Sequence, residues 1–520
     1  MEQTIKYPIG IQTFEEIRNE KYLYVDKTGL IYNLVNRNKY VFLGRPRRFG
    51  KSLLISTLQA YFEGRKELFE GLAIAELEKE WRRHPVIRID LSGESYEHPD
   101  KILKRLNLIL SRYEDVYGNS QDETTPAARF GGIIRRAEEK TGQKVVILVD
   151  EYDKPMVDNI HNESLIEDFK TELRGFYSVI KESDAHIRFA MLTGVTKFAH
   201  VSIFSGLNNL NDVSLEPACN ALCGISESEF HRYFRESVRQ FSQTTKKPED
   251  EVYKLFKKNY DGYHFAKRGE DIYNPFSILK AFFKNDFGKY WFASGTPSLL
   301  INLLKRYDYP LRGIEGAQLS ELQLSDLSRP ERNYHALFYQ TGYLTIKGYN
   351  EESDKYILGM PNEEVRSAFW ECLYDQYILD RTDEFDTFSI EEFINDVKTG
   401  RPDEFMDRLQ SLIAQLSPGV ERKKEIHFQN ILQIIFTMLG FRMQSEITFA
   451  TGRADMIVQT PDYVYVMEFK INGSPEDAIR QILEKNYAVP FKSDPRTVYL
   501  IGASFNTETN QLESYQLEKY

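Results

Sequence analysis

The chain has 520 residues, too many for one ordinary hydrophobic core, so its length predicts two to four domains. A formal net charge of −11 excludes a protein that coats nucleic acid with a uniformly basic surface, and any contact with nucleic acid must be confined to one groove. Three cysteines exclude a disulfide framework and no apolar run is long enough for a membrane span, so we expect a cytoplasmic protein with no membrane partner.

The first 215 residues alternate short apolar runs with amphipathic stretches. The apolar runs are rich in β-branched and aliphatic residues and predict buried strands at 39–44, 85–92, 145–151 and 187–194. The stretches between them have the spacing of helices, at 52–64, 101–118 and 165–183. Alternation of strand and helix is typical of an α/β domain with a parallel, doubly wound sheet.

Strand signals fade after residue 225, which predicts an α-rich middle domain of the lid or winged-helix kind. From residue 425 the pattern changes to a helix, a hairpin, a second helix and a strand, which predicts a separate α/β domain. We therefore divide the chain into an N-terminal domain, an α-rich domain, a helical connector and a C-terminal domain, at 1–220, 221–345, 346–420 and 421–520.

The stretch "FLGRPRRFGKSLL", residues 42–54, has the order strand, loop and helix that a phosphate-binding loop requires. In such a loop the main-chain N–H groups surround the phosphates, the lysine reaches the terminal phosphates, and the hydroxyl holds Mg²⁺. Lys51 and Ser52 would have these two roles. The spacing differs from the usual one, because Arg45 stands where the first glycine of the motif normally lies.

A second stretch, "VVILVDEYD", predicts the acids of a nucleotide site. Asp150 ends a buried strand and can hold the Mg²⁺ shell, while Glu151 can orient the attacking water. Thr193 ends another strand and can sense the γ-phosphate. A helix cap would also explain an Asp-Glu pair, but two motifs in order, each at the correct end of a strand, favour ATP and Mg²⁺.

The loop arginines leave two alternatives open. Guanidinium groups bind phosphate oxygens well, so Arg45, Arg47 and Arg48 can clamp the nucleotide. They can equally form ion pairs with acids of a neighbouring domain. We expect at least one of the three to lie near phosphate.

Five segments together resemble a prokaryotic family of AAA-ATPase-like proteins: "YPIGIQTFEEIRNEKYLYVDKTGLI", "RPRRFGKSLL", "LVDEYDKP", "LTGVTKF" and "YNPFSIL". The resemblance covers nearly the whole chain, and the family's own loop has the shifted glycine. It implies an ASCE-type P-loop NTPase core and a contact near adenine from Tyr24–Thr28. The residues assigned to the nucleotide are Arg45, Pro46, Arg47, Arg48, Phe49, Gly50, Lys51, Ser52, Asp150 and Thr193, with Glu151 catalytic.

The hairpin "GRADMIVQTPDYVYVMEFK" brings a second group of charged residues together. Period-two alternation puts Glu468 and Lys470 on one face of its second strand, and Asp455 can oppose Glu468 from the first. Two carboxylates beside a lysine predict a Mg²⁺ pocket in which the metal activates water and the lysine steadies the phosphate. The alternative is a surface strand with a cross-strand ion pair.

This layout resembles the PD-(D/E)XK nuclease superfamily, whose restriction-endonuclease-like domain usually ends the same AAA-ATPase-like family. The resemblance implies that Asp455, Glu468 and Lys470 are catalytic, with support from Gln481, Lys485 and Tyr487. The family often has a Tyr-His pair on the preceding helix, where this chain has Glu425 and His427.

We expect an ATPase whose nucleotide cycle gates a metal-dependent nuclease that acts on nucleic acid, with DNA the first choice. A rival function is a nucleotide-dependent switch or scaffold whose C-terminal domain binds without cleaving. A third interpretation keeps the nuclease and treats the ATP site as a structural relic. Homo-oligomerisation stays open.

Overall fold

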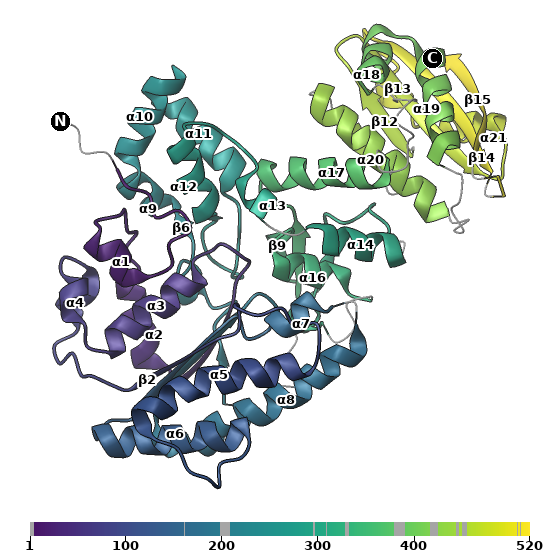
Figure 1. Cartoon of the computed structure of the whole chain (residues 1–520). Coiled ribbons are helices and arrows are strands. Elements are labelled where there is room, and N and C mark those ends of the chain that lie inside the picture. Colours follow the sequence, from purple (N-terminus) through teal and green to yellow (C-terminus); the bar gives the residue numbers. More distant parts are fainter. Residues whose placement is uncertain are drawn as a thin grey trace. The chain divides into compact units, whose positions relative to one another are not determined.

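The chain is described by a computed structural model, drawn in Figure 1. The described residues are 5–160, 162–197, 209–294, 297–307, 309–327, 332–378, 390–416, 425–443, 447–449, 455–506, 508–509 and 511–520. They fall into two compact units. The first comprises Met1–Gly295 and Glu315–Val365, and the second comprises Thr296–Ile314 and Arg366–Tyr520. No helix within the described ranges is both long and apolar enough to cross a bilayer.

The first unit is built on a five-stranded parallel sheet with the order β2-β3-β4-β1-β5. Its strands are β1 (Tyr40–Gly44), β2 (Val86–Asp90), β3 (Val145–Asp150), β4 (Ile187–Gly194) and β5 (Asn211–Asp212). Every residue of β3 is buried, as expected for a strand covered on both faces. The four strands predicted from apolar runs are confirmed, and β4 lies between β1 and β3.

Helices of this core follow the predicted alternation. They are α1 (Phe14–Asn19), α2 (Thr28–Arg37), α3 (Lys51–Phe62), α4 (Ala73–Leu77), α5 (Asp100–Tyr117), α6 (Pro126–Thr141), α7 (Lys154–Asp158) and α8 (Glu163–Glu182). The helices α5, α6 and α8 run side by side (Figure 1). The rings of Phe130 and Phe176 stack between α6 and α8 with centroids 4.7 Å apart. This confirms the predicted α/β fold with a parallel sheet.

An α-rich part follows within the first unit. Its helices are α9 (Glu227–Tyr233), α10 (Arg235–Thr245), α11 (Glu249–Tyr260), α12 (Pro275–Lys284) and α13 (Tyr290–Ser294), and a two-stranded sheet of β6 (Ile225–Ser226) and β7 (Ile272–Tyr273) accompanies them. Ser226 and Glu229 form a reciprocal capping box that starts α9. The core is aromatic, with the rings of Phe256 and Phe282 stacked at 4.3 Å. The predicted helical character of this part is confirmed.

A small antiparallel sheet belongs to the first unit and was not predicted, since residues 221–345 were expected to be α-rich and 346–420 to be a helical connector. It consists of β8 (Gln318–Leu319), β9 (Thr345–Asn350) and β10 (Lys355–Gly359), with α15 (Glu321–Ser325) and α16 (Tyr334–Thr341) beside it. The strands are short and their hairpin turn is acidic, so neither gives a clear periodic signal. A two-stranded hairpin is marginal alone, and the third strand comes from a distant segment.

The second unit contains a mixed five-stranded sheet in which only β13 and β14 are parallel. Its strands are β11 (Ile447–Phe449), β12 (Met456–Gln459), β13 (Tyr463–Ile471), β14 (Thr497–Asn506) and β15 (Gln511–Lys519). Its helices are α14 (Pro297–Tyr307), α18 (Ile390–Thr399), α19 (Pro402–Leu416), α20 (Glu425–Met443) and α21 (Pro475–Glu484). The predicted order of helix, hairpin, helix and strand is confirmed, whereas β15 was not predicted. Helix α17 (Glu363–Tyr377) begins in the first unit and ends in the second.

Candidate functional site

The phosphate loop joins the end of β1 to the start of α3. Two of its residues have left-handed backbone conformations, Arg48 with φ 67° and Gly50 with φ 97°. Glycine adopts that conformation without strain, and Cβ of any other residue at position 50 would have space but an unfavourable φ. Left-handed residues that alternate with right-handed ones turn successive N–H groups inward, and α3 adds the positive end of its dipole. This geometry suits an anion.

Lys51 is the first residue of α3 and its ammonium group spans the loop. The side chain donates hydrogen bonds to the main-chain oxygens of Arg45 at 2.9 Å and Pro46 at 3.0 Å. Lys51 is buried, and this burial lowers the pKa of its ammonium group, while the charges of Glu151 and Asp150 oppose the shift. The ammonium group of Lys51 is held by carbonyl oxygens of the loop, and phosphate oxygens can replace these carbonyl oxygens when a nucleotide binds.

Arg45 is directed into the protein rather than toward the mouth of the loop. Its guanidinium donates to the main-chain oxygens of Ser214 at 2.8 Å and Cys219 at 3.0 Å, and it lies over the ring of Phe265 at 4.3 Å. The residue is only 2% exposed. The arginine in place of the usual glycine therefore connects the loop to the chain that follows β5.

The other two loop arginines lie nearer to solvent. The guanidinium of Arg47 is 4.0 Å from the carboxylate of Asp158, and Arg48 is exposed and lies 5.1 Å from the ring centre of Phe276. Arg47 and Arg48 can therefore still reach a bound phosphate, unlike Arg45. That at least one loop arginine lies near phosphate stays a prediction, which now concerns these two.

Phe49 attaches the loop to the α-rich part. Its ring contacts Tyr263 and Phe265 edge-on at centroid distances of 4.7 and 5.3 Å, and its carbonyl oxygen accepts a hydrogen bond of 3.1 Å from the N–H of Gly224. Because Phe49 is buried, its side chain is a packing anchor of the loop. Its assignment to the nucleotide from sequence fits its main chain better than its ring.

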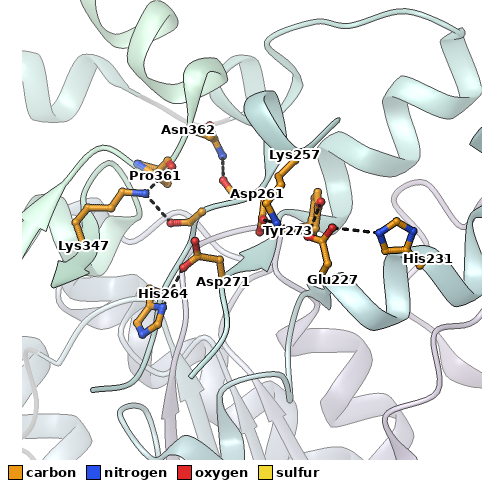
Figure 2. Close-up of polar contacts among 11 residues, drawn as sticks. Glu227, His231, Lys257, Asp261, His264, Asp271, Tyr273, Lys347, Pro361 and Asn362 are labelled. Atoms are coloured by element: carbon orange, nitrogen blue, oxygen red, sulfur yellow. Dashed lines mark hydrogen bonds and ion pairs between the residues drawn. The ribbon is translucent and has the colours of Figure 1, made fainter. Parts of the chain in front are cut away.

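The turn that packs against Phe49 is itself fixed by polar contacts, which Figure 2 shows. Lys347 donates to the main-chain oxygen of Gly262 at 3.0 Å, and the side-chain amide of Asn362 donates to that of Asp261 at 2.9 Å. In the same turn His264 pairs with an aspartate, as expected for a structural histidine. The wall behind the phosphate loop is therefore held by several independent contacts.

Asp150 lies at the end of β3, one strand away from the phosphate loop. The intervening strand β4 presents Thr193, whose hydroxyl donates a hydrogen bond of 2.8 Å to Oδ1 of Asp150. Arg88 of β2 approaches Oδ2 at 3.8 Å. Thr193 thus orients the carboxylate that we expect to serve Mg²⁺, a contact that its sequence position alone did not reveal.

Glu151 follows β3 in a left-handed conformation, with φ 52°. A non-glycine residue in this region is uncommon and marks a position fixed by its surroundings. Burial raises the pKa of its carboxyl group, and the ammonium of Lys51 opposes that rise.

Asp153 is a site residue that sequence reasoning missed. It is buried, and its carboxylate accepts hydrogen bonds from the Thr196 N–H and hydroxyl, both at 2.6 Å, and from the Val195 N–H at 3.1 Å. Burial raises the pKa of this carboxyl group. Asp153 fixes the turn after β4, and the third acid of "DEYD" was the available signal.

A cavity adjoins the phosphate loop on the side of the N-terminal segment. Its enclosed volume is about 100 Å³, and it is open to solvent on one side. Among the residues that line it are Tyr24, Lys27, Gly50, Leu53, Cys223 and Leu279. The ammonium of Lys27 pairs with Glu229 of α9, and burial lowers the pKa of Lys27.

The predicted nuclease centre lies on the hairpin β12–β13 of the second unit. The pairing of Met456 with Met467 puts Asp455 directly opposite Glu468. The N–H of Asp455 donates to Oε2 of Glu468 at 3.1 Å, and the N–H of Phe469 donates to Oδ2 of Asp455 at 3.0 Å. The two carboxylates are thus brought together by the hairpin itself.

Lys470 and Gln481 complete this centre. The ammonium of Lys470 lies 3.5 Å from Oε1 of Glu468, and the amide of Gln481, on α21, bonds to both side chains. Burial and the charge of Asp455 raise the pKa of Glu468, which is only 4% exposed. Of the other supporting candidates, Lys485 caps α21 and Tyr487 packs against the core below it. The side chains of Glu425 and His427 lie outside the described residues.

Two family models match the chain, one described as predicted AAA-ATPase at residues 8–204 and one as PD-(D/E)XK nuclease superfamily at residues 423–515. A relative from Azotobacter chroococcum mcd 1, called "Uncharacterized protein in vnfD 5'region", is 34% identical over 534 residues. The match covers 99% of this chain and 99% of the relative. The chain belongs to the AAA-ATPase-like family. Its second unit carries the nuclease-superfamily part of that architecture.

In this AAA-ATPase-like protein the nuclease-like centre fits a hard divalent cation. Mg²⁺ prefers oxygen ligands and is usually held by one or two carboxylates with several waters. Asp455 and Glu468 supply that number. Among the described residues no group of three or more histidines, cysteines and acids gathers around a common point, so a fully protein-enclosed metal cage is absent from this part of the chain.

Proposed function

We propose that this AAA-ATPase-like protein binds and hydrolyses ATP and couples that cycle to metal-dependent cleavage of nucleic acid, with DNA as the first candidate substrate. The observation that carries the proposal is the strand order, in which β4 lies between β1 and β3. It sets the acids at the end of β3 beside the phosphate loop, with Thr193 bonded to Asp150 at 2.8 Å.

In the nucleotide site, positively charged groups bind the phosphates and oxygen-bearing side chains bind the cation. The main-chain N–H groups at the start of α3 and the ammonium of Lys51 bind the phosphates, while Ser52 and Asp150 hold the cation that accompanies ATP. That cation supplies neutralisation of the β- and γ-phosphates. Glu151 orients the attacking water, a role that its position directly after Asp150, in a fixed left-handed conformation, supports.

The cavity beside Gly50 is the proposed position of the base and ribose. Its lining is mainly apolar, which suits a flat purine, and the N-terminal segment contributes Tyr24 and Lys27. This assignment supports the adenine contact expected of Tyr24–Thr28.

At the second centre, Asp455 and Glu468 would hold a divalent cation through their carboxylate oxygens. When bound, such a cation lowers the pKa of a coordinated water and so provides a nucleophile near neutral pH. Lys470 carries a positive charge 3.5 Å from Glu468 and can neutralise the phosphate that is attacked. Gln481 keeps both side chains oriented.

The four-part division of the chain and its cytoplasmic location stay proposals. The division at residues 220, 345 and 420 rests on changes of sequence pattern. The location rests on the low number of cysteines, three in the whole sequence, of which Cys219 and Cys223 are buried.

The test measures phosphate release and DNA cleavage by the full chain with Mg²⁺ or Mn²⁺. We expect Glu151→Gln to bind ATP but to hydrolyse it at least about 100-fold more slowly, because it loses its base. We expect Glu468→Gln to lose cleavage and keep hydrolysis, with the exposed acid variant Glu476→Gln as its control. Wild-type protein that neither hydrolyses ATP nor cuts single-stranded or duplex DNA or RNA would overturn the proposal.

A nucleotide-dependent switch or scaffold remains the second candidate function. One observation favours it: both oxygens of Glu468 and Oδ2 of Asp455 already accept hydrogen bonds from nitrogen donors. Nucleic-acid binding that responds to ATP, with no cleavage under any metal, would select this function over the nuclease.

A further inference from the structure

We propose that Arg312 is a built-in counter-ion of the nuclease-like centre, which competes with the divalent cation for Asp455 and keeps the centre in a low-affinity state. The inference rests on the proposed metal site at Asp455 and Glu468. It assigns a function to a residue that lies far from both motifs in sequence and that no sequence pattern singled out.

The contact involves Oδ1 of Asp455, the carboxylate oxygen that accepts no hydrogen bond from the described residues of the hairpin. Oδ2 of Asp455 accepts the main-chain N–H of Phe469 at 3.0 Å. Oδ1 faces the guanidinium of Arg312, whose Nη1 lies 3.5 Å away. A cation bound between Asp455 and Glu468 would need this same Oδ1, so the guanidinium and the metal compete for one position.

Within the part of the chain that the structure describes, two positive charges match the two carboxylates of the centre. Lys470 lies 3.5 Å from Glu468 and Arg312 lies 3.5 Å from Asp455, so each carboxylate has its own cation. A divalent cation that enters this centre must therefore either displace Arg312 or accept repulsion from it.

The main chain around Arg312 is anchored on both sides. The side chain of Asn430, on α20, accepts a hydrogen bond from the N–H of Leu311 and donates one to the main-chain oxygen of Tyr309, each at 2.8 Å. Leu311 and Ile314 are buried, and the Ile314 N–H bonds to the Leu311 oxygen at 3.2 Å. Arg312 is thus presented to the centre from a fixed turn.

The turn that carries Arg312 belongs to a short segment of the second unit that is separated in sequence from the rest of that unit. Residues 296–314 belong to the second unit, although the chain before and after them belongs to the first. Arg312 therefore reaches the nuclease-like centre from a segment inserted between parts of the AAA-ATPase-like unit. The side chains of Arg312 and Asp455 are 32% and 33% exposed, so the pair is accessible to solvent and can open.

The experiment measures Mn²⁺ binding to the full chain by calorimetry and by the electron paramagnetic resonance signal of free Mn²⁺, without nucleotide. We expect Arg312→Gln to bind Mn²⁺ about tenfold more tightly than wild type at the centre, and Arg312→Lys to stay close to wild type because it keeps the charge. The site is identified by its loss in the double variant Arg312→Gln/Glu468→Gln.

Arg401→Gln is the matched control. It removes one positive charge from the same unit, where Arg401 pairs with Asp396 at 2.6 Å, and it should leave Mn²⁺ affinity unchanged. Equal or weaker binding by Arg312→Gln, with wild type clearly binding, would overturn the role of Arg312 and leave the proposed metal site intact. If neither wild type nor Arg312→Gln binds Mn²⁺, the proposed metal site falls, and the role of Arg312 falls with it.

Discussion

The indole Nε1 of Trp291 donates a hydrogen bond of 2.9 Å to the carbonyl oxygen of Arg47. A residue of α13 thereby holds the phosphate loop in place. The main-chain N–H of Trp291 in turn donates to Oε1 of Glu364 at 2.6 Å, so α13 is tied to the first turn of α17. The loop is supported by contacts that come from segments far along the chain.

Replacement of Trp291 by phenylalanine tests this support. The variant keeps an aromatic ring but loses the donor to Arg47, and one hydrogen bond is worth about 1 kcal/mol. We expect the dissociation constant for ATP, measured by calorimetry, to rise about fivefold. Trp81→Phe is the control, because the buried indole nitrogen of Trp81 has no hydrogen-bond partner in the described part of the chain. Equal affinities of the two variants would contradict the role of Trp291.

Lys51→Ala should abolish stabilisation by nucleotide. A ligand at one hundred times its dissociation constant stabilises a protein by about 2.7 kcal/mol, and the thermal midpoint of wild type should rise accordingly with MgATP. The variant should show no rise, because it loses the ammonium that crosses the loop. Lys39→Ala, which removes a surface pair with Asp184 beside the start of β1, should respond like wild type. A full shift in Lys51→Ala would contradict the assigned phosphate site.

Asp153→Ala should destabilise the first unit. The substitution leaves the N–H groups of Val195 and Thr196 without their acceptor, and each unsatisfied buried donor costs about 1–3 kcal/mol. We expect a loss of about 3 kcal/mol in the free energy of unfolding, measured by urea denaturation. Asp158→Ala, which removes a partly exposed pair with Lys154 and the 4.0 Å approach of Arg47, should cost less than about 1 kcal/mol.

We expect the stability of the protein to depend on pH through the buried carboxyl group of Glu364. Burial raises the pKa of its carboxyl group from 4.5 to about 7. Between these values the folded protein keeps a proton that the unfolded chain has lost, so this group's contribution to stability is complete below pH 4.5 and is lost as the pH rises through 7. The loss corresponds to about 3 kcal/mol.

Glu364→Gln should remove this dependence while it keeps an oxygen for the N–H of Trp291. We expect the variant to be more stable than wild type at pH 8 and about equal to it at pH 5, by urea denaturation at each pH. Glu363→Gln, one residue earlier in α17, serves as the control and should match wild type at both pH values. A gain in stability that is the same at pH 5 and pH 8 would contradict the assigned pKa.

Local sequence patterns determined much of the fold. The apolar runs predicted β1 to β4. Strands β1, β3 and β4 are buried along nearly their whole length, as a strand covered on both faces is, whereas the edge strand β2 alternates buried and partly exposed residues. The alternation around Glu468 and Lys470 predicted their common face, since side chains of a strand point to opposite sides in turn. The hairpin β9–β10 was missed because its strands are short and partly exposed, and the nine-residue strand β15 was missed because its sequence has few apolar residues.

Tertiary structure decided which of the predicted side chains meet. The position of β4 between β1 and β3 brings Thr193 to Asp150, and the chain after β5 draws the guanidinium of Arg45 away from the mouth of the loop. No spacing in the sequence connects Trp291 with Arg47, or Arg312 with Asp455. The periodicity of apolar residues in the sequence indicates which face of its own helix or strand a residue occupies. The contacts between these pairs depend instead on how distant segments pack together.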